Sequence, residues 1–210
     1  MEDKLFNISE FSNLEFKFRK LGYSLIAGVD EVGRGAIAGP VFASAVILPP
    51  KIEDLEIKKI KDSKLISPQK REELFDYICK IALDYSISCV EVEEINRIGI
   101  SRATFKAMLK ALKSLKIKPQ LVLIDGPCGI PEYKGLQKAI VDGDKFCLSI
   151  SAASILAKVA RDRYMKEIEN LYPQYGFSQH KGYATKLHLE KIKKYGPSPI
   201  HRIYYKCFKK

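Results

Sequence analysis

Residues 24–48 decide the fold of this chain and read SLIAGVDEVGRGAIAGPVFASAVIL. Residues 24–29 form a short apolar run, and residues 41–48 form a second one that is rich in amino acids that favour β-strands. The segment between them is rich in glycine and begins with two acids, Asp30 and Glu31. The stretch therefore predicts two strands joined by a glycine-rich connection, with two carboxylates where the first strand ends.

Strands and helices follow one another along the rest of the chain. Ser67-Pro68 predicts a helix start, because serine caps helices and proline fits their first turn. Residues 85–92 and 121–124 have strand patterns, and residues 139–141 are a further candidate. Helical periodicity begins at Ser101 and covers residues 151–170 and 185–194. This order of elements is typical of an α/β protein with a mixed sheet covered by helices.

The composition indicates a globular, basic protein. A chain of 210 residues makes one ordinary domain. The net charge is 36 − 25 = +11, with 24 − 21 = +3 in residues 1–160 and 12 − 4 = +8 in residues 161–210. An unevenly basic chain favours an anionic partner such as a nucleic acid.

Cysteine usage and hydropathy bear on the location of the protein. Five cysteines without a C-x-x-C pair argue against a disulfide framework or a zinc cluster. The first twenty residues lack the apolar core of a secretory signal. Residues 36–50, the longest apolar stretch, are shorter than the ~20 residues of a membrane span. We expect a soluble cytoplasmic protein without a membrane segment.

Carboxylates at strand ends are the candidates for chemistry. Asp125 follows the predicted strand 121–124, as Asp30 follows the first strand, and Asp144 lies in the turn-prone VDGDK. Binding sites in α/β sheets lie outside strand ends, and gathered carboxylates select hard cations such as Mg²⁺ or Mn²⁺. Two such ions about 4 Å apart can drive phosphodiester cleavage. The alternative is that Asp30 caps a strand and that Asp125-Gly126 is a turn.

Other chemistries lack their motifs. Gly33-Arg34-Gly35 lets the backbone approach a ligand and Arg34 can bind a phosphate, but no G-K-[ST] follows. The serine-hydrolase pattern G-x-S-x-G is absent. The three histidines lack zinc spacing, so we expect surface or packing roles for them: His180, His188 and His201.

Six motifs in order resemble those of ribonuclease HII, the bacterial type 2 ribonuclease H. They read GVDEVGRG (28–35), DSK (62–64), LIDG (123–126), GD (143–144), SISAASILAKV (149–159) and QHKGY (179–183). The resemblance in order and spacing extends from about residue 24 to 202, nearly the whole chain. The resemblance implies a ribonuclease H-like fold, in which a mixed central sheet is flanked by helices and followed by a helical C-terminal portion. It divides the chain into an extension (1–23), a catalytic domain (24–202) and a basic tail (203–210).

The activity implied by the resemblance is that of a metal-dependent endoribonuclease. Such an enzyme hydrolyses the RNA strand of RNA–DNA hybrids and cuts 5′ of single ribonucleotides embedded in duplex DNA, leaving 3′-hydroxyl and 5′-phosphate ends. The implied cofactor is Mg²⁺ or Mn²⁺ in a two-ion site, and we expect a monomer. The metal-binding and catalytic acids would be Asp30, Glu31, Asp125 and Asp144.

Substrate-binding residues are also implied by position. Backbone groups of Gly33-Arg34-Gly35 would contact the ribose 2′-hydroxyl, so a side chain at either glycine should block that approach. Tyr183 would stack on the sugar that follows the ribonucleotide. Lys64 and Lys158 are candidate phosphate contacts, with solvated or helix-supporting roles as the alternative, and Asp162 is expected to pair with neighbouring arginines.

The chain departs from the family pattern at three places, and two alternatives stay open. Gly99 stands where the family often has asparagine, Pro127-Cys128 where it favours Asn-Arg, and Tyr204-Tyr205 where it usually has Ser-Phe. Ribonuclease HIII is a related alternative, although it carries an extra N-terminal domain and about 23 residues precede the first strand here. A non-catalytic, basic nucleic-acid-binding protein is the other alternative, and it would not need the four acids.

Overall fold

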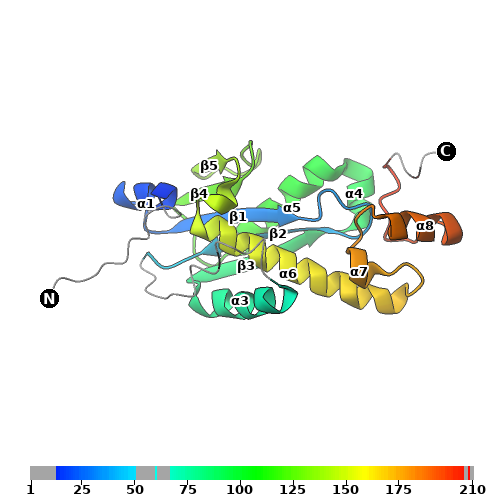
Figure 1. The fold of residues 1–210 in the computed structure, drawn as a ribbon. Helices are drawn as coiled ribbons and strands as arrows, with labels where there is room; N and C mark the ends of the chain where they lie inside the picture. The colour runs from blue at the N-terminus through cyan, green and yellow to red at the C-terminus, as the bar shows by residue number, and fades with distance from the viewer. Residues whose placement is uncertain (1–12, 51–59, 61–66, 206–207, 209–210) are drawn as a thin grey trace.

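A computed structural model describes residues 13–50, 60, 67–205 and 208 (Figure 1). Its five strands form one sheet in the order β3-β2-β1-β4-β5. Their bounds are β1 (Ile26–Val32), β2 (Val41–Ile47), β3 (Asp84–Val90), β4 (Leu121–Asp125) and β5 (Gln137–Ile140). β2 runs antiparallel to β1 and β3, whereas β4 runs parallel to β1 and β5. The sheet is therefore mixed, which confirms the predicted fold class.

Helices cover both faces of this sheet. Those described are α1 (Asn13–Lys20), α3 (Pro68–Ile81), α4 (Val92–Ile98), α5 (Ile100–Ser114), α6 (Leu148–Leu171), α7 (Phe177–His180) and α8 (Lys186–Tyr195), with the short 3-10 helix η1 (Gly143–Lys145) before α6. α5 packs on β2 and β3, and α6 packs across β1 and β2 with α3 beside it. Figure 1 shows α7 and α8 beyond one end of the sheet, where they form the predicted helical C-terminal portion.

Side-chain alternation assigns each strand residue to one face. In β1, Ala27 and Val29 join the core cluster under α5, whereas Ile26 joins Leu123 of β4 and Ile150 of α6 in another cluster. Successive residues of a strand point to opposite faces. Asp30 and Asp125 therefore share the face that carries α6.

Gly28 lets α6 lie unusually close to β1. A Cβ atom built on Gly28 would lie 2.1 Å from the carbonyl carbon of Ser149, in the first turn of α6. No other residue type leaves this space. The close contact explains why the motif GVDEVGRG pairs with the small-residue motif SISAAS, and it holds the start of α6 over the strand that carries Asp30.

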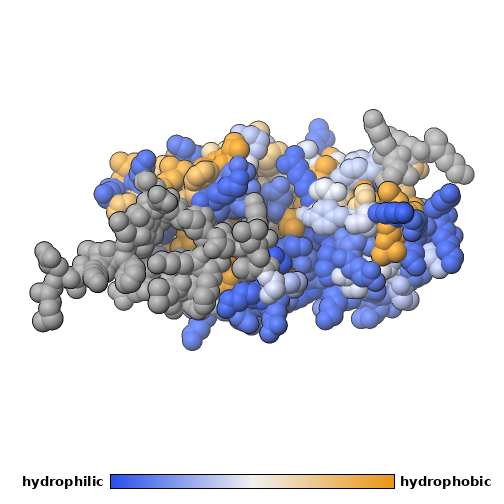
Figure 2. All heavy atoms as spheres, in the orientation of Figure 1, coloured by the Kyte–Doolittle hydropathy of each residue, from blue (hydrophilic) through white to orange (hydrophobic). Residues whose placement is uncertain are grey.

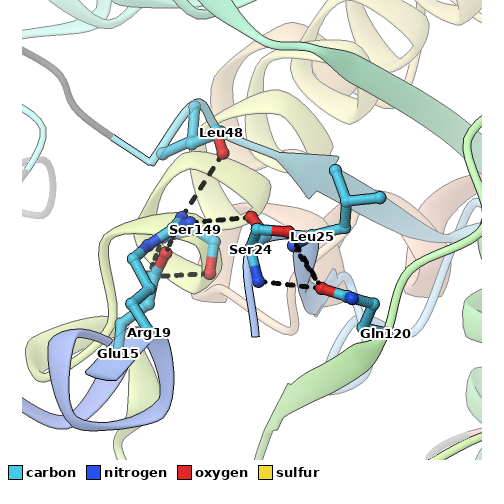
Figure 3. A network of polar contacts seen from close by, with 7 residues as sticks. All are labelled: Glu15, Arg19, Ser24, Leu25, Leu48, Gln120 and Ser149. Carbon is cyan, nitrogen blue, oxygen red and sulfur yellow. Dashed lines mark hydrogen bonds and ion pairs between the residues drawn. The ribbon is translucent and has the colours of Figure 1, made fainter. Parts of the chain in front are cut away.

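A polar network ties α1 to the same end of α6 (Figure 3). Glu15 of α1 is almost fully buried and accepts hydrogen bonds from the backbone N–H and the Oγ of Ser149, at 3.0 and 2.9 Å. Arg19 pairs with Glu15 at 2.8 Å and donates to the carbonyls of Ser24 and Leu48. Glu15 thus serves as a cap for α6, whose own N-cap residue supplies no side-chain hydrogen bond.

The predicted elements are found with shifted ends. Ser67 caps α3 by accepting from the N–H of Lys70 at 3.2 Å, as its sequence predicts. The strand predicted for residues 85–92 ends at Val90, because Val92 already begins α4. α1, α4 and α7 were not predicted, since each is eight residues or shorter and carries little periodicity. Gly99, one of the departures from the family pattern, joins α4 to α5.

Where Figure 2 is coloured, hydrophilic side chains predominate over the region of α7 and α8, with a small apolar group among them, and more apolar side chains gather near α1 and β5. Within the described residues, no helix combines the length and the hydropathy needed to cross a bilayer.

Candidate active site

Two parallel strands bring Asp30 and Asp125 together. Val29 of β1 is in register with Ile124 of β4, so the next residue of each strand is an aspartate. Both aspartates lie on the face under α6, and Ser154 of α6 hydrogen-bonds the side chain of Asp30. Strand pairing and helix packing therefore produce the convergence of acids that the sequence predicted.

Burial and like charge make this acid pair electrostatically unfavourable without a cation. Asp30 is only 6% exposed, and its pKa is raised from 3.8 to about 8 by burial first and then by Glu31 and Asp125. Burial and Asp125 also raise the pKa of Glu31, against the opposing effect of Arg34, whose Nη1 lies 3.8 Å from a Glu31 oxygen. Three carboxyl groups thus interact with one another, and the nearest basic group offsets only part of their repulsion.

Asp144 is placed beside this group by η1. The N–H of Gly143 donates to Oδ1 of Asp125 at 2.6 Å, which fixes η1 against the end of β4. Asp144, the next residue, is 8% exposed. Asp30 and Glu31 of β1, Asp125 of β4 and Asp144 of η1 thus come from three elements that meet at one end of β1 and β4.

The donor chemistry of these acids fits a divalent ion. Carboxylate oxygens are the ligands that Mg²⁺ and Mn²⁺ prefer, and neutralising a buried group of acids is what such an ion does. In the described part of the chain, no three Asp, Glu, His or Cys side chains are already arranged around a single metal position. The fit therefore rests on the type, burial and mutual repulsion of the acids.

Tyr183 lies against the Gly33-Arg34-Gly35 turn. Gly33 has a φ of +89°, and Ala36 N–H closes the turn on its carbonyl at 3.2 Å. A Cβ atom at Gly35 would lie 4.0 Å from Cε1 of Tyr183. The carbonyl of Gly182 accepts from the N–H groups of Ile37 and Ala38, at 2.9 and 3.2 Å. The turn and the tyrosine thus form one surface beside Glu31.

Gly33 also has a packing role, while its predicted backbone contact with the ribose stays a prediction. A Cβ atom there would lie 2.1 Å from Nε of Arg161, a fully buried residue of α6. The space beside Gly33 is therefore filled by the protein's own arginine, whereas the space beside Gly35 is open apart from Tyr183.

The remaining predicted residues have mixed outcomes. Lys64 lies outside the described residues. Lys158 pairs with Asp162 one helical turn away at 2.7 Å, so the expected pairing of Asp162 with arginines is wrong and its partner is a lysine. This ion pair matches the helix-supporting alternative for Lys158, and contact with a phosphate stays a prediction.

The histidines pack in the interior rather than at the surface. The rings of His180 and His188 stack with centroids 4.0 Å apart, and Nε2 of His188 lies 3.0 Å from Nε2 of His201. Burial lowers the pKa of His188 and of His201 to about 4. Nδ1 of His188 also contacts the carbonyl of Tyr183 at 2.9 Å, so this neutral cluster supports the loop that carries the tyrosine.

Sequence reasoning missed Arg161 and Arg202, which are both fully buried. Arg161 and Arg202 donate to main-chain carbonyls of residues 34–40 and of Lys181, and Arg202 also interacts with the side chain of Tyr205. The available signal was that Arg161 stands on the apolar side of α6, four residues before buried Met165.

Comparison with known proteins assigns the family. The ribonuclease HII family model matches residues 27–208. The chain belongs to the ribonuclease HII family. It is 49% identical over 193 residues to ribonuclease HII of Caldicellulosiruptor bescii, covering 92% of each chain. Ribonuclease HII of Caldanaerobacter subterraneus is 48% identical over 98% of this chain and 83% of its own.

Solved structures agree with this membership. The crystal structure of ribonuclease H2 from Pyrococcus horikoshii superposes with a TM-score of 0.74 at 30% identity, over 87% of this chain and 94% of the other. Archaeoglobus fulgidus RNase HII, solved in complex with PCNA, gives 0.72 at 26% identity, over 87% and 95%. Membership of the ribonuclease HII family makes the chain a ribonuclease H, an endonuclease that acts on RNA–DNA hybrids. The matched residues include 203–208, most of the predicted tail.

The two glycines of the turn predict different mutant phenotypes. Gly33→Ala combines a positive φ with a clash against Arg161, and we expect a loss of roughly 1–3 kcal/mol in the free energy of unfolding. Gly35→Ala meets only an ordinary contact with Tyr183, so its melting temperature should equal that of the wild type. Calorimetry of both variants measures this, and equal destabilisation of the two would contradict the packing described.

Asp30 predicts a pH-dependent stability of the metal-free protein. The pKa of Asp30 is about 8 in the folded protein and 3.8 ordinarily. Between about pH 4 and 8 the unfolded chain has therefore lost the Asp30 proton while the folded protein still holds it. The free energy of unfolding decreases as the pH rises through this range. Asp30→Asn removes this loss. In EDTA at pH 8 we expect the variant to be more stable by on the order of a few kcal/mol, with the difference vanishing towards pH 4.

Thermal melts across this pH range test the expectation, with Glu167→Gln on the exposed side of α6 as a control that should follow the wild type. A variant that is less stable than the wild type at pH 8 would show that Asp30 is not under electrostatic stress.

Proposed function

We propose that the chain is a divalent-ion-dependent endoribonuclease that hydrolyses the RNA strand of RNA–DNA hybrids and also cuts 5′ of single ribonucleotides embedded in duplex DNA. The products would carry 3′-hydroxyl and 5′-phosphate ends. One observation carries the proposal: a buried, mutually repelling group of acids lies next to a glycine turn and a tyrosine that are suited to contact a ribose. We further propose that the enzyme acts as a monomer in the cytoplasm.

The acids would hold the cation. Asp30, Glu31, Asp125 and Asp144 are the proposed ligands; the pairing of β1 with β4 and the hydrogen bond from Gly143 to Asp125 support this choice. A divalent ion bound there would supply an activated water and charge stabilisation for the departing 3′ oxygen. Ser154 and the N–H of Gly143 orient Asp30 and Asp125 towards this task by hydrogen bonding to their carboxyl groups.

The turn and the tyrosine would read the sugar. Gly35 is exposed and its peptide can approach the 2′-hydroxyl, the group that separates RNA from DNA. Tyr183, half-buried beside it, offers an aromatic face to the following deoxyribose. Arg34, exposed at the tip of the turn, and Lys158 are the proposed cations for flanking phosphates.

A cleavage assay tests the proposed function. An end-labelled DNA duplex with one ribonucleotide is incubated with the enzyme and Mg²⁺ or Mn²⁺, beside an all-DNA duplex and an EDTA lane. We expect one metal-dependent cut immediately 5′ of the ribonucleotide. Cleavage of long hybrids alone would contradict the sugar-reading roles of the turn and Tyr183, and binding without cleavage would favour a non-catalytic protein.

The acids predict a separation of cleavage from binding. Asp30→Asn and Asp125→Asn should each lower the cleavage rate by roughly a thousandfold or more, because several kcal/mol of transition-state stabilisation are lost. Affinity for the duplex should stay the same or rise, since a negative charge facing phosphate is removed. Single-turnover rates and anisotropy titrations measure the two, and Glu167→Gln should behave as wild type. Substantial turnover in both Asn variants would contradict the assignment.

A further inference from the structure

Two buried arginines converge on the loop that follows β1. Arg161 of α6 donates from Nε to the carbonyl of Pro40 at 3.1 Å and from Nη2 to that of Ala38 at 3.0 Å. Arg202 donates from Nε to the carbonyl of Gly39 at 2.8 Å and from Nη1 to that of Ala36 at 2.7 Å. Segments more than a hundred residues away in sequence therefore hold one short loop.

Burying two guanidinium groups is costly, and the cost is compensated locally. Burial lowers the pKa of Arg161 to about 10, so the side chain stays charged at neutral pH, and Arg202 is also fully buried. No ion pair of either residue is found in the part of the chain that the structure describes. Carbonyl dipoles of the loop supply the compensation, so the conformation of the loop and the position of the two arginines depend on each other.

Arg202 and Tyr205 fix the orientation of the Arg34 carbonyl in the Gly33-Arg34-Gly35 turn. It accepts from Nη1 of Arg202 at 3.2 Å and from the hydroxyl of Tyr205 at 3.0 Å. The peptide bond between Arg34 and Gly35 is trans, so its N–H points away from its carbonyl. The Gly35 N–H therefore points away from Arg202. Gly35 itself is exposed and lies beside Tyr183.

Arg161 connects the same loop to the tyrosine. Its Nη1 donates to the carbonyl of Lys181 at 2.8 Å, and its guanidinium carbon lies 5.5 Å from the centre of the Tyr183 ring. Its side chain also fills the space where Gly33 lacks a Cβ atom. One residue thus sets the distance between the turn and the aromatic ring.

We propose that Arg161, Arg202 and Tyr205 are positioning residues that select ribonucleotides indirectly: Arg202 and Tyr205 turn the Gly35 N–H towards the 2′-hydroxyl of the substrate, and Arg161 holds Tyr183 in register with it. This inference rests on the proposed function, in which the turn reads the ribose.

Tyr205→Phe is the most direct test, since it removes the hydroxyl that donates to the carbonyl of Arg34 and interacts with the Arg202 side chain, and it keeps the ring that stacks on Tyr204. Affinities for a duplex with one ribonucleotide and for the matching all-DNA duplex are measured by anisotropy in an Asp30→Asn background, so that no cleavage occurs. We expect Tyr205→Phe to lower the preference for the ribonucleotide by about two- to tenfold, the value of one hydrogen bond, with unchanged affinity for all-DNA duplex.

Two further variants sharpen the measurement. Arg202→Lys keeps the positive charge but cannot reach three carbonyls, so it should lower the preference more than Tyr205→Phe does. Tyr195→Phe removes the hydroxyl of an exposed tyrosine on α8 and should change neither affinity. If Arg202→Lys does not fold, as circular dichroism would reveal, Tyr205→Phe still decides.

An unchanged preference in Tyr205→Phe, or equal weakening of both affinities, would overturn the inference and leave the proposed function intact. If the parent protein itself shows no preference for the ribonucleotide, the proposed sugar reading fails, and the inference fails with it.

Discussion

The confinement of like-charged carboxyl groups at the ends of two adjacent parallel strands is the constraint on which the site depends. Parallel pairing of β1 and β4 brings Asp30 and Asp125 to the same edge and face, and burial raises the pKa of Asp30 to about 8. An α/β sheet tolerates such a group only where something else compensates for it. The hydrogen bonds from Ser154 and Gly143 offset part of the repulsion between these carboxyl groups. A bound divalent ion would offset the rest.

α6 couples this acid group to the ribose-facing surface. Its first turn lies on Gly28 and is capped by Glu15 of α1, its second turn carries Ser154 to Asp30, and its middle carries Arg161 to Gly33. A single rigid helix therefore sets both the position of the acids and the position of the turn. This arrangement explains why small residues in the first turns of α6 are followed by a buried arginine. The part of α6 that contacts the acids lies about two helical turns before the part that contacts the proposed ribose-binding turn.

The convergence of Asp30 and Asp125 could be predicted from the sequence, whereas the residues that support the site could not. Asp30 and Asp125 each follow an apolar run, and the end of a strand is a local pattern that sequence reveals. Arg161 looks like an ordinary helix residue, because its partners are carbonyls as far as 123 residues away that no periodicity identifies. The histidines illustrate the same limit: without ligand spacing they were expected to lie at the surface or to pack, and only tertiary contacts reveal that they stack on each other in the interior. Gly33 lies in the turn, as predicted, but the sequence does not reveal that the side chain of Arg161 in α6 occupies the space where a side chain of residue 33 would be.

Binding of Mn²⁺ tests the central claim, that the acid group is a divalent-ion site, most directly. Mn²⁺ is titrated into the wild type, Asp30→Asn, Asp125→Asn and the control Glu167→Gln, and the free ion is followed by its electron paramagnetic resonance signal. The account predicts that the wild type and the control bind Mn²⁺ equally and that each Asn variant binds it at least tenfold more weakly, a difference of about 1.4 kcal/mol. Equal binding by all four proteins would contradict it.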